Sequence, residues 1–218
     1  MDRSAPGYGL VTVTDVEVLE RTLQRCIDEF PGETLRLLDI GVHRGDTTRA
    51  LARYLSERDA AFEYFAVDSG KEAGEAPFPE CQMIWGDSAE VFMKAPDRLH
   101  WVFIDGCHCS NHAVLDFCNY GCLVIERGYV LFHDASPRAQ RRFDYQGHGP
   151  REAHEFGSAV PTALQRLGLS QGCRTDWILV VEGWDEQNWG GVAVYRRENR
   201  HEAPSHLGKR VSMATGGK

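Results

Sequence analysis

Apolar residues follow two patterns along the chain, short continuous runs and longer stretches with a three- to four-residue period. The runs have the length of buried strands, and the periodic stretches are typical of amphipathic helices. The expected strands are residues 35–40, 62–67, 82–85, 101–104 and 129–132. The clearest expected helices are residues 14–30, 47–55 and 111–125. Strands that alternate with helices need crossover connections, so the pattern predicts a mostly parallel sheet.

The end of the chain follows a different pattern. Residues 177–181 and 192–195 are strand-like runs joined by a short polar segment, which leaves no room for a crossover helix. We therefore expect an antiparallel hairpin at one edge of the sheet. The predicted fold class is α/β, a Rossmann-like, doubly wound and mostly parallel sheet. It occupies one domain, residues 1–197, with a helical segment at residues 1–33.

Two polar stretches fall outside this pattern. Residues 135–157 interleave arginines with aromatic residues and directly follow an expected strand. A loop this long inside a compact domain is typical either of a lid over a binding site or of a mobile, solvated loop, and the aromatic residues favour the lid. Residues 198–218 are polar, and we expect a disordered tail.

Composition limits the classes of partner. The 218 residues suffice for one α/β domain, and a formal net charge of -8 argues against a nucleic-acid partner. The chain shows no apolar signal segment and no run of the roughly 20 apolar residues that span a bilayer, so we expect a soluble cytoplasmic protein. Its 7 cysteines are then expected to be reduced and mostly buried. Whether the chain forms a homo-oligomer stays open.

A tight turn with two glycines follows the first expected strand. Gly41 and Gly45 would let the backbone pass close to a ligand at the carboxyl end of the sheet, and Asp39 lies just before them. In the dinucleotide pattern G-x-G-x-x-G, His43 and Asp46 would occupy the second and third glycine positions. This departure disfavours a nicotinamide cofactor and a dehydrogenase.

Acidic residues end the next two strands. Asp68, followed by Ser69, can accept hydrogen bonds from a ribose diol, and Asp87 with Ser88 could reach an adenine edge. Each acid alone could be a helix N-cap. Their occurrence in order at successive strand ends favours an adenosine-containing ligand.

Residues 35–195, from D-x-G-x-x-x-G through G-D-S, V-F-I-D-G-x-H and G-Y-V-L-F-H-D, resemble the class I S-adenosylmethionine-dependent methyltransferases. The resemblance implies a seven-stranded sheet in the order 3-2-1-4-5-7-6. The residues that it implies around the cofactor are Asp39, Gly41 and Gly45 at the methionine part, Asp68 at the ribose, Asp87 and Ser88 at the adenine, with Ser69 and Asp105 alongside.

An acceptor site is expected at the ends of the fourth and fifth strands. Asp105 ends the fourth strand, and His133 and Asp134 end the fifth, so their side chains could hold a hard divalent cation such as Mg²⁺. His108 could take the proton of an acceptor hydroxyl, because an imidazole titrates near neutrality. The sequence thus favours O-methylation of a small molecule.

The spacing Asp105-x-x-His108, with an acid after strand five, is similar to metal-dependent sugar O-methyltransferases of macrolide biosynthesis. That resemblance implies metal ligands at Asp105, His133 and Asp134 and a general base at His108. Those enzymes have an acid where this chain has His133, which leaves the metal open. A metal-independent N- or C-methyltransferase and a non-catalytic S-adenosylmethionine-binding protein also stay open.

Four cysteines suggest a rival zinc site. Cys107 and Cys109 form C-x-C, and Cys118 and Cys122 form C-x-x-x-C. We expect Cys118 and Cys122 on the apolar face of a helix beside Phe117, where buried structural thiols belong. This expectation disfavours zinc.

Overall fold

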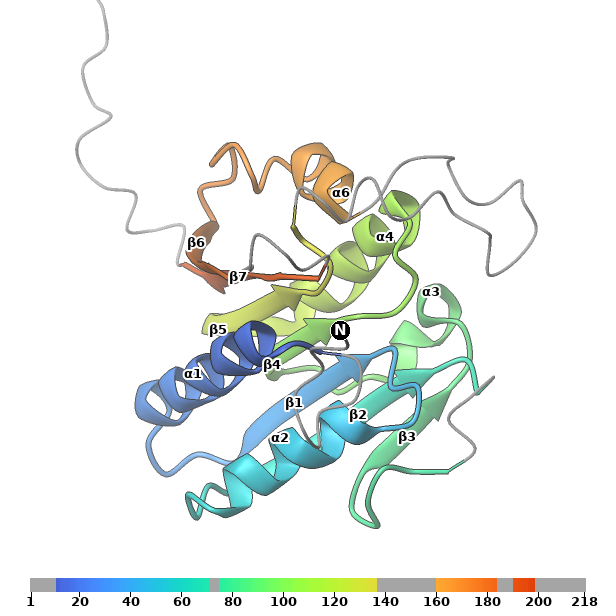
Figure 1. Cartoon of the computed structure of the whole chain (residues 1–218), viewed down its shortest axis with the longest axis vertical. Helices are drawn as coiled ribbons and strands as arrows, with labels where there is room; N and C mark the ends of the chain where they lie inside the picture. The colour runs from blue at the N-terminus through green and yellow to red at the C-terminus, as the bar shows by residue number, and fades with distance from the viewer. Residues whose placement is uncertain (1–10, 71–74, 137–159, 184–189, 199–218) are drawn as a thin grey trace, which may run out of the picture.

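The computed structural model describes residues 11–70, 75–136, 160–183 and 190–198. Within them, seven strands form one sheet in the order β3-β2-β1-β4-β5-β7-β6 (Figure 1). The strands are β1 (Leu35–Ile40), β2 (Phe62–Asp68), β3 (Gln82–Trp85), β4 (Leu99–Ile104), β5 (Val124–Phe132), β6 (Trp177–Gly183) and β7 (Val192–Arg197). The α-helices are α1 (Val13–Glu29), α2 (Asp46–Ser56), α3 (Ser88–Val91), α4 (Ser110–Tyr120) and α6 (Val160–Arg166), and the 3₁₀ turns are η1 (Phe92–Lys94) and η2 (Gly121–Leu123).

The predicted strand order and fold class are confirmed. Strands β3, β2, β1, β4 and β5 are parallel to one another, and β7 lies between β5 and β6 and is antiparallel to both. Parallel strands joined by helices bring the carboxyl ends of β1, β2, β3, β4 and β5 to one edge of the sheet. That edge is where the sequence places the candidate ligand-binding residues.

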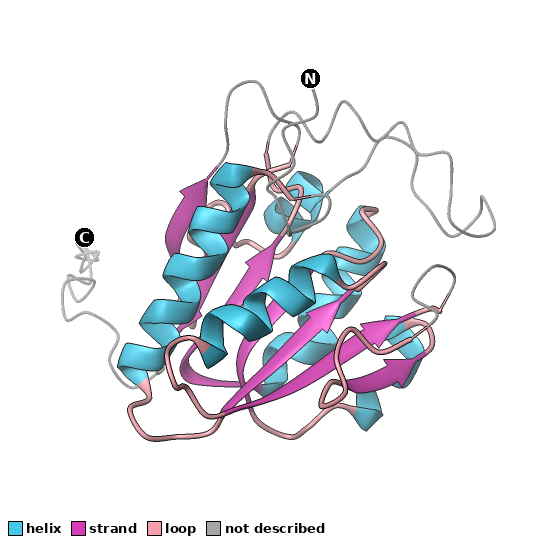
Figure 2. Ribbon diagram, turned by 60° about the horizontal axis from the view of Figure 1, so that its bottom comes forward, coloured by secondary structure: helices cyan, strands magenta, loops and turns pink. Residues whose placement is uncertain are grey.

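Helices cover both faces of the sheet, so the fold has three layers and two apolar cores (Figures 1 and 2). One core joins the sheet to α1 and α2 through residues such as Leu19, Leu23 and Leu51. The other core joins the opposite face to α4 and α6 through residues such as Phe117 and Leu164. A sheet buried on both faces explains why its strands read as continuous apolar runs rather than as alternating ones.

The helix expected at residues 111–125 is too long. Helix α4 ends at Tyr120, the η2 turn follows, and Val124 already begins β5 and pairs with Leu99. The apolar residue Val124 fits a helical period by spacing alone, although it is fully buried in the sheet.

The expected cysteine burial is also wrong. Only Cys26, Cys81 and Cys109 are buried, while Cys118 and Cys122 are exposed. The early end of α4 accounts for Cys122, which lies in the η2 turn rather than on a helix face. None of the seven cysteines forms a disulfide.

Two further expectations, the lid and the tail, concern residues that the structure does not describe. Most of the expected lid, residues 137–157, and the expected tail beyond residue 198 lie outside the described residues. None of the described helices is long and apolar enough to cross a membrane.

Candidate active site

The loops after β1 and β4 touch at the carboxyl edge of the sheet. The backbone N–H of Asp105 donates to the Ile40 carbonyl at 2.9 Å. Gly41 has φ +89°, and a Cβ there would lie 2.3 Å from the Asp105 carbonyl oxygen. Only glycine fits this position without displacing backbone. The sequence pattern indicates a ligand beside this glycine, whereas its immediate neighbour is the loop after β4.

Asp39 lies beneath this edge and is only 3% exposed. Its Oδ2 accepts hydrogen bonds from the Thr48 hydroxyl at 2.7 Å and the Tyr64 hydroxyl at 2.9 Å, while its Oδ1 has no partner. Burial raises the pKa of Asp39 to about 7, although the two hydroxyl bonds act in the opposite direction. The carboxyl group thus ties β1 to α2 and β2 from within the core.

Asp68 organises the turn after β1. Its Oδ2 accepts the backbone N–H groups of Val42 at 2.9 Å and His43 at 3.0 Å, and its Oδ1 accepts that of Gly70 at 2.7 Å. A carboxylate offers roughly four acceptor positions, so these bonds leave room for one more donor. Ser69, the next residue, is exposed. The predicted ribose contact is compatible with this arrangement.

Asp87 and Ser88 begin α3 at the same edge. Asp87 is the N-cap, and its Oδ1 accepts the Ala89 N–H at 2.9 Å. The Tyr120 hydroxyl donates to the Ser88 carbonyl at 2.8 Å and ties α3 to α4. The structure thus confirms the capping role that the sequence allowed for Asp87. About half of the Asp87 side chain is exposed to solvent.

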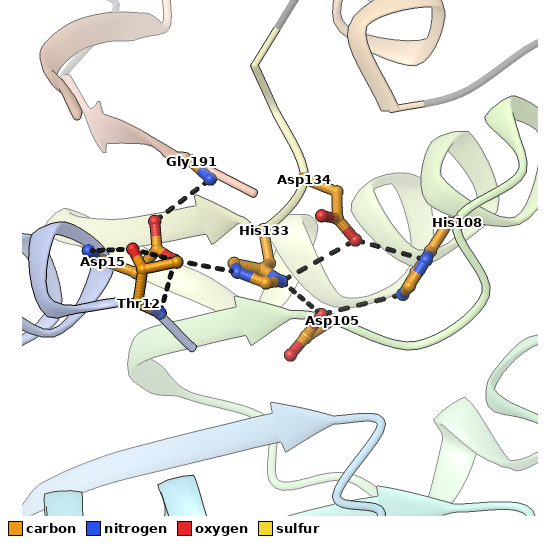
Figure 3. A network of polar contacts seen from close by, with 7 residues as sticks. All are labelled: Thr12, Asp15, Asp105, His108, His133, Asp134 and Gly191. Atoms are coloured by element: carbon orange, nitrogen blue, oxygen red, sulfur yellow. Dashed lines mark hydrogen bonds and ion pairs between the residues drawn. The ribbon is translucent and has the colours of Figure 1, made fainter. Parts of the chain in front are cut away.

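Three of the predicted acceptor-site residues converge. Asp105, His108 and Asp134 each place one ligand atom within 4.8 Å of the others (Figure 3). His108 Nδ1 lies 3.2 Å from Asp134 Oδ2, and His108 Nε2 lies 3.8 Å from Asp105 Oδ1. Asp134 has φ +53°, a strained backbone that non-glycine residues rarely adopt and that aims its carboxylate at His108.

His133 is not part of this three-residue set, although the sequence included it among the metal ligands. Its Nδ1 lies 2.9 Å from Asp105 Oδ1, and its Nε2 lies 3.4 Å from Asp15 Oδ2. Burial lowers the pKa of His133, but Asp105 and Asp134 outweigh it and hold that pKa well above the ordinary value. The buried imidazolium of His133 lies between Asp15 and Asp105 and contacts both carboxylates (Figure 3).

Asp15 is a member of this network that the sequence analysis did not single out. It is fully buried, its Oδ1 accepts the Gly191 N–H at 3.0 Å, and its Oδ2 accepts the Thr12 N–H at 2.9 Å. Burial raises the pKa of Asp15, but His133 and the Thr12 bonds outweigh it, so the pKa is lowered. The T-x-x-D capping box was the available signal, because it marks the start of α1. It contains nothing about the distant partner His133.

The charges of this network are unequal. Asp15, Asp105 and Asp134 face the two imidazoles of His108 and His133 (Figure 3). Burial raises the pKa of Asp134, and the neighbouring imidazoles offset this only in part. The carboxyl group of Asp134 therefore holds a proton more tightly than a carboxyl group in water does.

Comparisons with known proteins agree with the fold. Residues 38–135 match a family described as a methyltransferase domain. No curated protein matches the chain. Solved structures that are similar include MycE from the mycinamycin biosynthetic pathway, in complex with Mg, S-adenosylhomocysteine and mycinamycin VI (TM-score 0.59, 16% identity). That match covers 91% of this chain but only 53% of MycE, so the chain spans about half of that protein.

Two other solved structures match over most of both chains. The O-methyltransferase NovP matches with TM-score 0.57 and 15% identity, over 88% of this chain and 83% of NovP. TomG, an O-methyltransferase from Streptomyces achromogenes in complex with S-adenosylmethionine, matches with TM-score 0.57 and 16% identity, over 87% and 82%. At these identities, the likeness establishes the fold.

Proposed function

We propose that this chain, which carries a methyltransferase domain on the fold of the S-adenosylmethionine-dependent enzymes, methylates a hydroxyl oxygen of a small molecule. The family match and the fold support the cofactor and the class of reaction. The observation that carries the choice of an oxygen acceptor is the pair of contacts that the His108 imidazole makes with Asp105 and Asp134.

His108 is the proposed general base. The 3.2 Å contact between its Nδ1 and Asp134 Oδ2 favours the tautomer in which Nδ1–H donates to the carboxylate. Nε2 is then the nitrogen that accepts the proton of the acceptor hydroxyl. In the reaction, the hydroxyl oxygen bonds to the methyl carbon of the sulfonium, the carbon–sulfur bond breaks, and the proton passes to His108. S-adenosylhomocysteine and a methyl ether are the products.

Asp105 and Asp134 are the proposed holders of a divalent cation. Their two carboxylates converge to within 4.8 Å and are the oxygen donors that such an ion prefers, and His108 lies beside them as the base. When bound, the cation would lower the pKa of the acceptor hydroxyl. His133 supports this pair as a buried cation bonded to Asp105, rather than as a third ligand.

The proposed cofactor contacts follow the carboxyl ends of β1 to β3. Asp68 keeps one acceptor position for a ribose hydroxyl, and the half-exposed Asp87 with Ser88 lies next along the same edge. Ser69 is an exposed hydroxyl beside Asp68. For Asp39 the structure favours a supporting role, because its carboxyl group is buried and bonded to two hydroxyls.

A turnover assay tests the proposal. The protein is incubated with S-adenosylmethionine and a panel of phenols, catechols and hydroxylated sugars, and S-adenosylhomocysteine and methylated products are measured by mass spectrometry. His108→Gln should lower the rate roughly 10²- to 10⁴-fold on any acceptor that is turned over, because it removes the general base. Asp28→Asn, an exposed change on α1, is the control substitution.

Each of the following outcomes would contradict a different part of this proposal. Methylation only at nitrogen or carbon, or an unchanged rate in His108→Gln, would remove His108 as the base of an O-methyl transfer. A rate that is unaffected by a metal chelator would remove the cation while leaving the base intact. Cofactor binding without turnover of any acceptor in the panel would favour a non-catalytic binding protein.

A further inference from the structure

A second cluster of metal-ligating side chains lies at the start of α4 and in the loop before it. Cys107, Cys109 and His112 each place one ligand atom within 4.8 Å of the other two. Two thiols and an imidazole form a soft donor set, unlike the oxygen-rich set of the acceptor site. We propose that these three residues bind a thiophilic divalent cation of the zinc class, at a site separate from Asp105 and Asp134.

The start of α4 arranges the ligands in advance. Cys109 is the N-cap of the helix, and its Sγ accepts the backbone N–H of His112 at 3.4 Å. The same Sγ lies 3.1 Å from His112 Nδ1, because residues three apart at a helix start face the same side. Cys109 is buried, so this pair is held by packing as well as by the cap. Little ordering remains to be done when an ion binds.

The spacing suits tetrahedral coordination. Bond lengths of roughly 2.3 Å to sulfur and 2.0–2.1 Å to nitrogen place neighbouring ligand atoms about 3.5–3.8 Å apart in a tetrahedron. The pair of Cys109 and His112 is slightly closer than this, and the whole set spans at most 4.8 Å. Side-chain rotations that move the ligand atoms by roughly 1 Å would bring all three within bonding distance of one ion. A water or a further side chain would complete the fourth position.

Two carboxylates next to the cluster favour a cation. Asp87 Oδ2 lies 3.9 Å from His112 Nε2, the ring nitrogen that faces away from Cys109. A carboxylate in this position orients a metal-bound imidazole and raises its basicity. Asp116 lies one helical turn beyond His112, is fully buried, and neither of its carboxylate oxygens forms a well-aligned hydrogen bond. A bound dication would offset the charge of both groups.

The four-cysteine site considered from the sequence differs from this one. Cys118 and Cys122 are exposed and do not belong to the converging set, whereas His112 supplies the third ligand. The sequence offered C-x-C followed three residues later by histidine, but no spacing rule marks that pattern as a zinc site.

Cobalt titration tests the proposal on the intact chain. With all thiols reduced and counted, Co²⁺ is added, and the thiolate-to-cobalt charge-transfer absorption is recorded, followed by displacement with Zn²⁺. We expect one equivalent of cobalt to produce the band, and zinc to abolish it. Cys107→Ser and Cys109→Ser should each lose the band. Serine is itself a favoured N-cap, so Cys109→Ser should keep the start of α4 intact.

Matched variants distinguish this cluster from the other thiols and carboxylates of the chain. Cys118→Ser, which removes an exposed thiol of the same helix, should keep the band. Asp134→Asn should keep it as well, because that residue belongs to the acceptor site. Asp87→Asn should weaken cobalt binding roughly 10- to 100-fold, as expected for a carboxylate that orients a liganding imidazole. No band in the reduced wild type, a band that survives both Cys107→Ser and Cys109→Ser, or a band lost in Cys118→Ser would overturn the proposal.

Discussion

Replacement of Asp39 by asparagine should stabilise the protein at alkaline pH. The carboxyl group is 3% exposed, Oδ2 accepts two hydroxyl bonds, and Oδ1 has no partner. Burial raises its pKa from 3.8 to about 7, so the folded protein holds this proton more tightly than the unfolded chain does. Asparagine keeps a carbonyl oxygen for Thr48 and Tyr64 and cannot ionise.

The pH window follows from the direction of that shift. Between pH 3.8 and about 7, the folded state binds more protons at Asp39 than the unfolded state, so stability falls as pH rises through this window. A shift of about 3 units at 1.36 kcal/mol each corresponds to a penalty on the order of 4 kcal/mol above pH 7. The asparagine amide, placed where Oδ1 has no partner, costs about 1–3 kcal/mol. Asp39→Asn should therefore be about 1–3 kcal/mol more stable than wild type at pH 8.

Urea denaturation at pH 5 and pH 8 measures this effect. At pH 5 the wild-type carboxyl group is mostly protonated in the folded state, so the advantage of Asp39→Asn should shrink by about 2–3 kcal/mol and can reverse. Asp28→Asn, the same change from acid to amide at an exposed position of α1, is the control. If the stability difference between Asp39→Asn and wild type were the same at both pH values, burial would not raise the pKa of Asp39.

Two further changes test the supports of the site. Gly41→Ala should destabilise the fold by about 2 kcal/mol or more relative to Gly32→Ala. Both glycines have positive φ, but only at Gly41 would a Cβ collide with backbone atoms of the loop after β4. Equal denaturation midpoints for the two variants would contradict this close contact between the loops. Asp15→Asn should lower the free energy of unfolding by on the order of 3 kcal/mol, because it removes a buried charge that faces His133. Asp28→Asn, on the exposed side of α1, should lower it by less than about 0.5 kcal/mol. A loss of stability below about 1 kcal/mol in Asp15→Asn would contradict a buried ion pair between Asp15 and His133.

The sequence predicted most of the fold because the sheet is buried on both faces. Residues 35–40 and 101–104 are apolar runs of strand length, and the structure has buried strands at those residues. The hairpin was also predictable, since residues 182–191 are too few for a crossover helix. The helix end was not predictable from period alone, because Val124 continues a helical spacing while belonging to β5.

The candidate site was predictable only as far as strand ends determine it. Asp105 and Asp134 end neighbouring strands, and the sequence therefore places them together with His108. It could not reveal that Asp15 lies against His133, because that contact joins residues distant in the chain through the packing of α1 on the sheet. It also could not reveal that Asp39 is enclosed by hydroxyl groups, since only the folded core brings them together.

Several expectations from the sequence stay predictions. They are the cytoplasmic location and the exclusion of a nucleic-acid partner. The proposed lid would lie largely in residues outside the described part of the chain.

Calorimetric titration with S-adenosylmethionine is the decisive test of the proposed cofactor. We expect one binding site per chain, no binding of NAD⁺ under the same conditions, and roughly tenfold or greater weakening in Asp68→Asn, provided that this variant keeps the wild-type circular dichroism spectrum. An absence of S-adenosylmethionine binding by the folded wild type, or binding of NAD⁺ in its place, would contradict the proposed function.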